Sequence, residues 1–239
     1  MVLSLRLLLA GATSALAIPV SSSSPSSTPT DDITSSPLGR RDTAASTGSH
    51  NGFYYSFWTD GGGEVDYANG DDGSYTVAWR NCSSFFGGKG WNPGLEDRNI
   101  TFAADTFEPE GNGYLSVYGW SKAPRVEYYV VENWGSYDPT SGFNPALRRA
   151  TIEVDGGTYH LGMQRIVQMT TQPDAVITQV WSVRDRDDRR AAGTVTMKAH
   201  FDAWREKLGI KIGTLDFQIV STEGYRSSGE AEVSVEKSG

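Results

Sequence analysis

The sequence is poor in the residues that build metal sites and covalent cross-links. Its 239 residues include one cysteine, Cys82, and three histidines. A single cysteine excludes an internal disulfide, and no group of cysteines and histidines has the spacing of a zinc site. We expect Cys82 to be a small buried hydrophobic residue rather than a nucleophile. The sequence therefore predicts no metal site.

Phosphate-binding glycine loops and heptad repeats are also absent. Beyond the N-terminal leader discussed below, no apolar run is long enough to cross a bilayer, so we expect no membrane partner. Lysine and arginine number 21 against 29 aspartates and glutamates, which gives a net charge of −8. A surface with this balance suits neither nucleic acid nor an anionic membrane, and no nucleic-acid partner is expected.

The N-terminal part of the chain has the composition of segments that are removed or left unfolded. Residues 1–17 combine an early basic residue, an apolar run at 7–10 and small residues at the end, which is typical of a secretory signal peptide. Residues 18–41 are dominated by Ser, Thr and Pro and end at the dibasic pair Arg40-Arg41. This composition predicts a pro-segment that is cleaved after the pair. The alternative is a flexible linker that stays attached.

Residues 42–239 are predicted to form a single domain with its core between about residues 50 and 237, since all-β domains reach this size as one unit. Two sequons in this region make Asn81 and Asn99 candidates for glycosylation. Together with the signal peptide, these features predict a secreted, extracellular protein. We expect it to be a monomer.

Period-two alternation predicts β-strands with two different faces. In residues 114–120, the aromatic and hydroxyl-bearing side chains alternate with Leu115 and Val117. Residues 126–131 repeat this plan and place Glu127 on the same face as Tyr129. A similar alternation in residues 217–225 places Glu223 on the same strand face as Phe217 and Tyr225, near the C-terminus.

Glycine-rich breaks punctuate these strands and predict turns between them. They are Gly61-Gly62-Gly63, Asn69-Gly70, Gly87-Gly88, Gly111-Asn112-Gly113 and Gly156-Gly157. Many short strands joined by tight turns favour an antiparallel β-sandwich, so the fold class is all-β.

Two segments depart from the strand pattern. Residues 200–208 carry apolar side chains at helical spacing and are followed by Gly209, which predicts one short amphipathic helix packed on the sheet. His200 is interpreted as a structural histidine at the start of that helix, the alternative being a pH-sensitive group. Residues 184–190 carry charges of both signs and are interpreted as a solvated turn, the alternative being a binding patch.

Glu127 and Glu223 are unusual because glutamate is rare in strands unless it faces water or takes part in chemistry. Aromatic neighbours are the groups on which a flat sugar ring stacks. A pair of carboxylates among aromatic side chains indicates cleavage of a glycosidic bond. The alternative for each residue is a solvated charge on an exposed strand.

Seven motifs, in this order, resemble those of glycoside hydrolase family 11 endo-1,4-β-xylanases. They are residues 55–61 (YSFWTDG), 87–91 (GGKGW), 114–120 (YLSVYGW), 127–135 (EYYVVENWG), 181–184 (WSVR), 200–204 (HFDAW) and 223–229 (EGYRSSG). The resemblance implies a β-jelly roll of two curved antiparallel sheets with one short helix. It also implies a long cleft for xylan, the expected polysaccharide partner, and no cofactor.

The resemblance assigns a separate role to each glutamate. Glu127 is implied to be the nucleophile and Glu223 the general acid/base of a double displacement. If the two carboxyl groups lie roughly 5 to 5.5 Å apart, the anomeric configuration is retained. Glu132 falls on the opposite strand face by alternation and is interpreted as structural.

Other positions carry over as substrate-binding residues of the cleft. Trp58 matches a tryptophan that stacks on a xylose ring, and Tyr118 and Tyr129 match tyrosines near the nucleophile. Four further positions match the lining of the cleft, each with a core or surface role as the alternative: Tyr114, Trp120, Arg165 and Gln179. Phe217 stands where the family usually has tyrosine.

Two departures from the family pattern concern the surroundings of the pair. Ala78 stands where the resemblance implies a polar partner of the acid/base, so the pH optimum is expected to be set without that partner. The tip of the hairpin over the cleft, called the thumb, falls at Met169–Thr171, or at Gln172–Ala175 in a shifted alignment. Either tip differs from the family's Pro-Ser-Ile.

Two other functions fit the same residues. A carbohydrate-binding jelly roll without catalysis would use the same aromatic side chains, and a β-1,4-glucanase would use a related fold. A role in eliciting plant defence is a further possibility on which the sequence is silent.

Overall fold

Eleven β-strands and one α-helix make up the described part of the computed structural model, which covers residues 43–141, 148–168 and 175–237. These residues belong to one compact unit that begins at Asp42. The elements in chain order are β1 (Ser46–His50), β2 (Phe53–Thr59), β3 (Glu64–Asn69), β4 (Tyr75–Trp91), β5 (Asn99–Lys122), β6 (Val126–Trp134), β7 (Arg148–Val154), β8 (Gly157–Gln168), β9 (Ala175–Arg184), the 3-10 turn η2 (Arg186–Asp188), β10 (Ala192–Thr196), α1 (Met197–Leu208) and β11 (Thr214–Val235).

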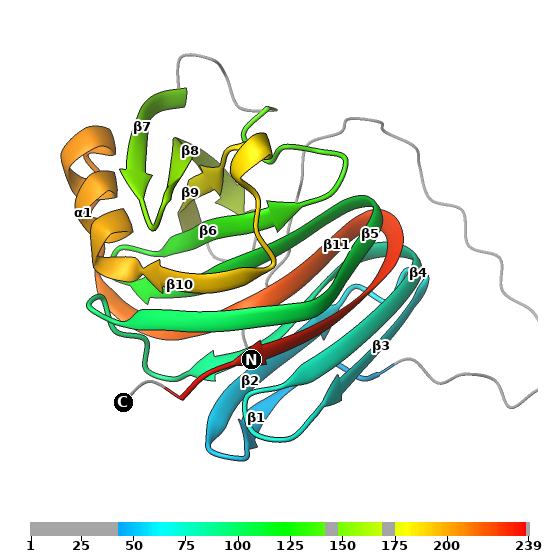
Figure 1. Ribbon diagram of the computed structural model, residues 1–239. Coiled ribbons are helices and arrows are strands. Elements are labelled where there is room, and N and C mark those ends of the chain that lie inside the picture. The colour runs from blue at the N-terminus through cyan, green and yellow to red at the C-terminus, as the bar shows by residue number, and fades with distance from the viewer. Residues whose placement is uncertain (1–42, 142–147, 169–174, 238–239) are drawn as a thin grey trace, which may run out of the picture. The chain divides into compact units, whose positions relative to one another are not determined.

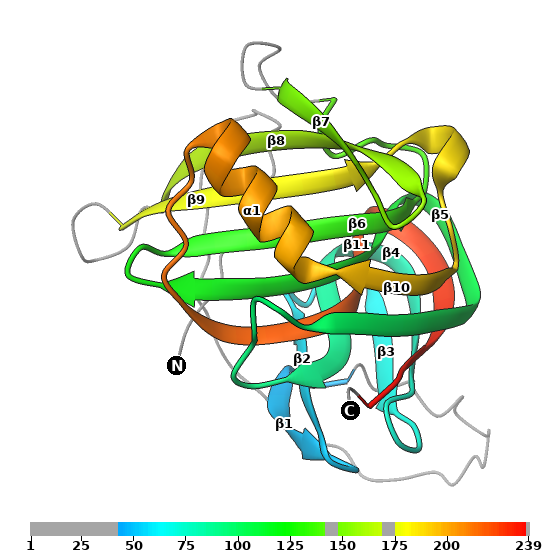
Figure 2. The ribbon, with the colours of Figure 1, turned by 60° about the vertical axis from the view of Figure 1, so that its left-hand side comes forward.

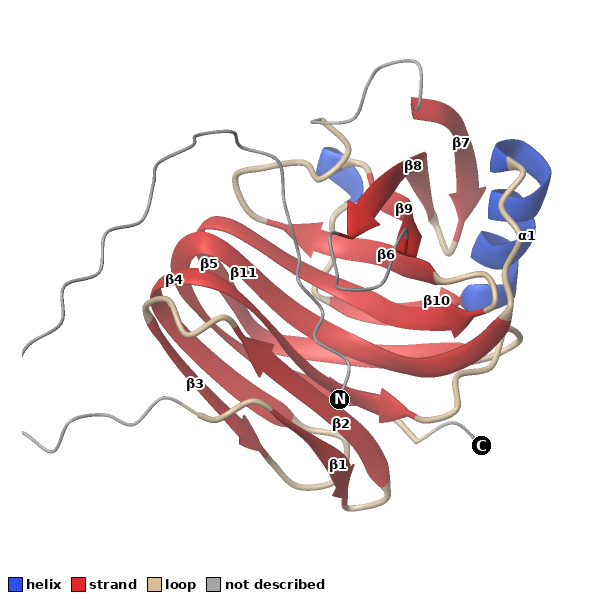
Figure 3. Ribbon diagram, turned by 180° about the vertical axis from the view of Figure 1, so that it is seen from behind, coloured by secondary structure: helices blue, strands red, loops and turns tan. Residues whose placement is uncertain are grey.

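The strands follow the order β1-β2-β4-β11-β5-β6-β9-β8-β7, with β3 added to β4 and β10 added to β5. Neighbouring strands are antiparallel except for β6 and β9, which are parallel. The long strands β4, β5 and β11 curve strongly, as Figures 1 and 3 show. The first half of β4 pairs with β3 and its second half with β2, so the long strands pass from one layer into the other. The predicted all-β jelly roll with a single helix is confirmed, and hydrogen bonds join its two layers into one folded sheet.

Two apolar clusters lie on the two faces of the layer that contains β6. The first is the core, which includes Leu115, Val117 and Tyr128. The second, which we call the aromatic face, includes the buried residues Phe86, Tyr114, Tyr118, Trp120, Tyr129, Val131, Trp134, Ile177, Trp181, Val183 and Ile219. The predicted alternation in residues 114–120 and 126–131 is confirmed, because successive side chains point to opposite faces. The core receives Leu115, Val117, Val126, Tyr128 and Val130, and the aromatic face receives Tyr114, Tyr118, Trp120 and Tyr129.

The helix begins earlier than predicted. It runs from Met197 to Leu208 rather than from His200, because the buried Met197 extends the apolar stripe by one more turn. Gly209 ends the helix with φ of 67°, as the sequence predicted. The helix lies across β6 and β9 (Figure 2), where Trp204 donates a hydrogen bond of 2.9 Å to the Ser182 hydroxyl.

Two of the predicted glycine turns lie inside strands instead. Gly87 and Gly88 belong to β4, and residues 111–113 belong to β5. At Gly88, an added Cβ would overlap the carbonyl oxygen of Val220 on the neighbouring strand, so the glycine permits close packing rather than a turn. The other three glycine breaks do connect strands, at residues 61–63, 69–70 and 156–157.

The charged segment 184–190 is only partly the solvated turn that its sequence predicts. Arg184 ends β9 and is 4% exposed, and Arg190 forms an ion pair with Glu132. Glu132 also accepts a hydrogen bond of 2.6 Å from Tyr159, and it is 1% exposed. These contacts support the structural interpretation of Glu132. The charge pattern was misleading because its two end arginines neutralise this buried carboxylate.

His200 lies on the buried side of the helix and is fully buried. Its ring packs edge-on against Tyr159, and its Nε2 lies 3.9 Å from the nearest carboxylate oxygen of Asp155. Within the described residues, neither ring nitrogen has a hydrogen-bond partner. Burial lowers the pKa of His200 to about 3, with the Asp155 charge acting in the opposite direction and Arg190 and Arg184 in the same one. The structural role interpreted from the sequence fits these surroundings.

We expect His200 to make the protein less stable in acid. Below its ordinary pKa of about 6.5, unfolding lets the histidine take up a proton that the folded protein does not bind. The free energy of unfolding should therefore fall as the pH drops from about 6.5 towards 3, by up to about 1.4 kcal/mol per pH unit from this residue. The free energy of unfolding, measured with urea, should change less steeply with pH in His200→Phe than in the unchanged protein between pH 6 and 4. The same pH dependence of the two proteins in this range would contradict the prediction. Above pH 7.5, where the histidine is neutral in both states, the two pH dependences should be equal.

Candidate active site on the aromatic face

Glu127 lies on β6 with its carboxylate held by two neutral donors. The Tyr118 hydroxyl donates to Oε1 at 2.8 Å, and the Gln179 side-chain amide donates to Oε2 at 2.6 Å. The residue is 2% exposed. Alternation along β6 points it to the aromatic face, and the register places Trp120 directly opposite on β5. Both carboxylate oxygens are thus oriented before any ligand binds.

A second pair of hydrogen bonds orients those donors. Trp120 donates through Nε1 to the Tyr118 hydroxyl oxygen at 2.6 Å, so that hydroxyl directs its own proton to Glu127. On the other side, Gln164 donates to the Gln179 side-chain oxygen at 2.5 Å. Because that oxygen is occupied, the amide group of Gln179 faces the carboxylate. The position of Glu127 therefore depends on a chain of side chains from β5, β8 and β9.

Glu223 lies on β11 and is 5% exposed. Its backbone partners are Tyr114 on β5 and Phe86 on β4. Burial raises the pKa of the Tyr114 hydroxyl, and the charge of Glu223 acts in the same direction. Tyr114 therefore stays neutral beside Glu223, as a hydroxyl rather than a phenolate.

The same aromatic group adjoins both glutamates. Phe86, opposite Glu223, lies edge-on to Tyr118 with ring centroids 5.3 Å apart, and Tyr118 is the residue that donates to Glu127. Tyr129 packs beside Tyr118 at 5.0 Å and stacks on Trp181 at 3.6 Å. The structure thus brings Glu127 and Glu223 to one face, on strands separated only by β5.

The other predicted cleft residues fall in different places. Trp58 is half-buried at the end of β2 and stacks near Phe86, with ring centroids 6.2 Å apart. Phe217 packs against Tyr118 on the same face. Arg165 does not join them. Alternation along β8 places it on the side of Met163, which packs on the core, whereas Gln164 reaches the aromatic face.

Ala78 does not lie beside Glu223, so the expectation that it replaces a polar partner of this glutamate is wrong. Its neighbours across the sheet are Asp66 on β3 and Glu230 on β11, seven residues along the strand from Glu223. The residue of β4 that faces Glu223 is Phe86. The alignment error arose because Gly87-Gly88 was interpreted as a break, so the continuous strand from Tyr75 to Trp91 was missed.

The hairpin proposed as the thumb is formed by β8 and β9, which pair antiparallel up to Gln168 and Ala175. The predicted tip, at Met169–Thr171 or from Gln172, lies outside the described residues except for Ala175. Asn81 and Asn99 are both exposed, as a glycosylated asparagine has to be. Glycosylation at these positions stays a prediction.

Sequence reasoning missed three residues of the site: Phe86, Gln164 and Trp181. Phe86 alternates with core residues of β4, a signal hidden by the glycines that follow it. Gln164 sits one residue from the predicted Arg165, so its strand face decides between them. Trp181 was recognised within a motif, but its stacking on Tyr129 becomes visible only when β6 and β9 are placed side by side.

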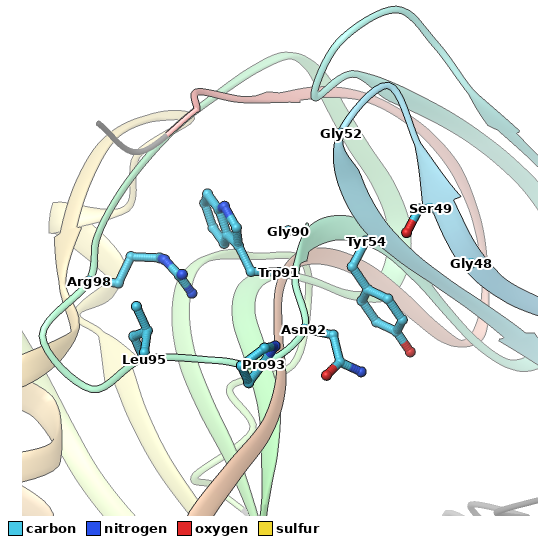
Figure 4. A pocket seen from close by; sticks show the side chains of 10 residues that line it. All are labelled: Gly48, Ser49, Gly52, Tyr54, Gly90, Trp91, Asn92, Pro93, Leu95 and Arg98. Atoms are coloured by element: carbon cyan, nitrogen blue, oxygen red, sulfur yellow. The ribbon is translucent and has the colours of Figure 1, made fainter.

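A pocket with a volume of about 640 Å³ lies away from the two glutamates, where β4 ends (Figure 4). Its tryptophan, Trp91, packs against Phe53 at 6.0 Å, and the guanidinium of Arg98 lies 4.3 Å from the centre of its ring. Tyr54 connects this pocket to the aromatic face through Phe217.

Within the described ranges, no group of three or more histidine, cysteine, aspartate or glutamate side chains is arranged to hold a metal ion. The same part of the chain contains no helix with the length and apolar character needed to span a bilayer. What the site offers is a pair of buried carboxyl groups among aromatic and amide side chains. This arrangement can supply a nucleophile and a proton donor.

Comparisons with known proteins point to one family. The family described as Glycosyl hydrolases family 11 matches residues 50–234. Endo-1,4-beta-xylanase 4 of Pyricularia oryzae is 50% identical over 199 residues, which cover 83% of this chain and 83% of that protein. Endo-1,4-beta-xylanase B of Phanerodontia chrysosporium is 47% identical over 201 residues, covering 84% and 67%. Ethylene-inducing xylanase 1 of Botryotinia fuckeliana is 47% identical over 199 residues, covering 83% and 68%.

Proposed function

Because the chain belongs to family 11 of the glycosyl hydrolases, we propose that it is a secreted endo-1,4-β-xylanase that cleaves internal bonds of xylan with retention of configuration. The relatives named as xylanases support the choice of substrate. The observation that carries the mechanism is the pair of neutral hydrogen bonds to Glu127, on the same face as Glu223.

Glu127 is the proposed nucleophile. A carboxylate attacks well when it is ionised, oriented and not neutralised by a cation. The Tyr118 hydroxyl and the Gln179 amide orient it without neutralising its charge. As the carboxylate oxygen bonds to the anomeric carbon, the glycosidic bond breaks and Glu223 protonates the leaving oxygen.

Glu223 then serves as the base of the second step. The sugar is now an ester of Glu127, so the negative charge that opposed ionisation of Glu223 is gone. Glu223 takes a proton from water as the water oxygen attacks the anomeric carbon. The ester bond breaks, the carboxylate of Glu127 returns, and two inversions leave the configuration unchanged.

The aromatic side chains support sugar as the ligand. Trp58 is half-buried at the end of β2, so part of its ring remains available for stacking on a pyranose. A non-catalytic carbohydrate-binding protein would use such a ring too, but it would have no need of two buried carboxyl groups. A β-1,4-glucanase would need both, and parallel assays on xylan and cellulose distinguish it from a xylanase.

Secretion is supported by the N-terminal composition. The compact unit begins at Asp42, directly after the dibasic pair Arg40-Arg41. This boundary fits the proposed removal of residues 1–17 as a signal peptide and of residues 18–41 as a pro-segment.

Glu127→Gln and Glu223→Gln should each lower the rate of xylan hydrolysis by more than about 1,000-fold, since each removes one partner of a two-residue mechanism. Timed hydrolysis of xylo-oligosaccharides, followed by NMR of the anomeric proton, should show the β-anomer forming first. Glu232→Gln is the matched control, because Glu232 lies exposed on the same strand as Glu223. Initial formation of the α-anomer would exclude retention, and greater activity on cellulose would exclude the xylanase.

Tyr118→Phe should lower kcat by about 10- to 100-fold, which corresponds to about 1.5 to 3 kcal/mol for a lost hydrogen bond to a charged group. The variant removes the donor to Glu127 and also leaves Trp120 Nε1 without its acceptor. Tyr67→Phe is the control, because the Tyr67 hydroxyl bonds to Asn69 on the core side. If both variants keep full kcat, the orientation of Glu127 does not depend on Tyr118.

Ala78→Asp should leave the pH–rate profile unchanged. The new carboxylate would face Glu230 and Asp66 rather than Glu223, which lies seven residues from Glu230 along β11. Xylan hydrolysis measured from pH 3 to 8 tests this expectation. A shift of either limb by half a pH unit would show that position 78 does act on the acid/base.

A further inference from the structure

Two arginines lie over a single tryptophan near one end of the aromatic face. The guanidinium carbons of Arg186 and Arg189 are 4.1 Å and 5.0 Å from the centre of the Trp134 ring. Arg189 is held in place, since its Nη1 donates to the Trp134 carbonyl and its Nε to the Arg186 carbonyl. Arg186 is exposed, and its side chain donates no hydrogen bond to any described residue.

Neither of these two arginines is paired with a carboxylate of its own turn. Among the described residues, neither arginine forms an ion pair, although the protein as a whole carries a net charge of −8. On the same turn, Asp185 pairs with His160, and Asp188 accepts a hydrogen bond from the Thr158 backbone. Asp187 is exposed, so water screens its charge. The turn therefore presents two guanidinium groups with free donors.

The arginines line a pocket of about 440 Å³, together with Phe107, Pro109, Asn133, Trp134 and Gly135. Its place relative to the glutamates follows from the strand register. Trp134 on β6 pairs with Tyr114 on β5, and Tyr114 pairs with Glu223 on β11. Two strand spacings put the backbones of Trp134 and Glu223 about 10 Å apart. A side group on a sugar near the cleaved bond would reach the pocket.

We propose that Arg186 and Arg189 bind a carboxylate-bearing side group of the polysaccharide, a uronic acid such as glucuronic acid attached to a xylose. This inference rests on the proposed function, because it concerns a substituent of the same substrate. A guanidinium presents paired N–H donors that match the two oxygens of a carboxylate. A neutral sugar side group offers no charge to which two guanidinium groups could pair. The pocket thus favours acidic xylan over neutral xylan.

Two matched oligosaccharides test the proposal. One carries a glucuronic acid on a xylose, and the other is the same molecule with the carboxyl group reduced to an alcohol. The quantity measured is the ratio of kcat/KM for the acidic substrate to that for the reduced one. Arg186→Gln should lower this ratio about three- to fivefold, as expected for an exposed charge pair worth up to about 1 kcal/mol. Arg186→Lys should retain part of it, and added salt should lower the ratio of the unchanged enzyme.

Arg80→Gln is the control, because Arg80 is an exposed arginine of the outer layer on β4 and its loss changes the net charge equally. The proposal is overturned if Arg186→Gln leaves the ratio unchanged or if Arg80→Gln lowers it as much. If the unchanged protein hydrolyses neither oligosaccharide, the proposed function is refuted instead. In that case, the ratio of the two dissociation constants, measured by calorimetry, replaces the ratio of kcat/KM and is judged by the same two criteria.

Discussion

The central position of β11 is the constraint on which the rest of the structure depends. It pairs with β4 from Gln218 to Val233 and with β5 from Thr214 to Val235. Among the strands of the described residues, β11 is the one that pairs with two of the three long strands. An added Cβ at Gly88 or Gly90 would overlap the backbone of β11, so these glycines let the three long strands curve together. Because Glu223 sits on β11, this packing also decides where the proposed proton donor faces.

Burial of two carboxyl groups on one face carries a desolvation cost that the surrounding hydrogen bonds must offset. For Glu127, Tyr118 and Gln179 supply this compensation, and Trp120 and Gln164 hold those two in turn. The donors come from strands far apart in sequence. The jelly roll is thus needed for the chemistry because it brings β5, β6, β8 and β9 side by side at this point.

Much of this arrangement can be predicted from the sequence where it depends on local alternation. The faces of residues 114–120 and 126–131, and the stop at Gly209, follow from periodicity and backbone freedom. Errors arose where the decisive contact is distant. Gly87-Gly88 has the composition of a turn but serves close packing against β11, and Arg184 has the composition of a loop but neutralises Glu132. The choice between Gln164 and Arg165 likewise depends on the face of β8 that meets Gln179.

Glu127 and Glu132 lie five residues apart on the same strand and show how surroundings separate chemistry from structure. Glu132 forms ion pairs with Arg190 and Arg184. If Glu132 lost its negative charge, these two arginines would be left without a counter-charge. Glu127 is bound by a hydroxyl and an amide, which carry no charge of their own. In the proposed mechanism Glu127 becomes an ester, and the two neutral donors then lose strength but leave no buried cation unpaired. Neutral donors such as Tyr118 and Gln179 therefore suit the carboxylate that gives up its charge in the proposed reaction cycle better than the arginines that pair with Glu132 would.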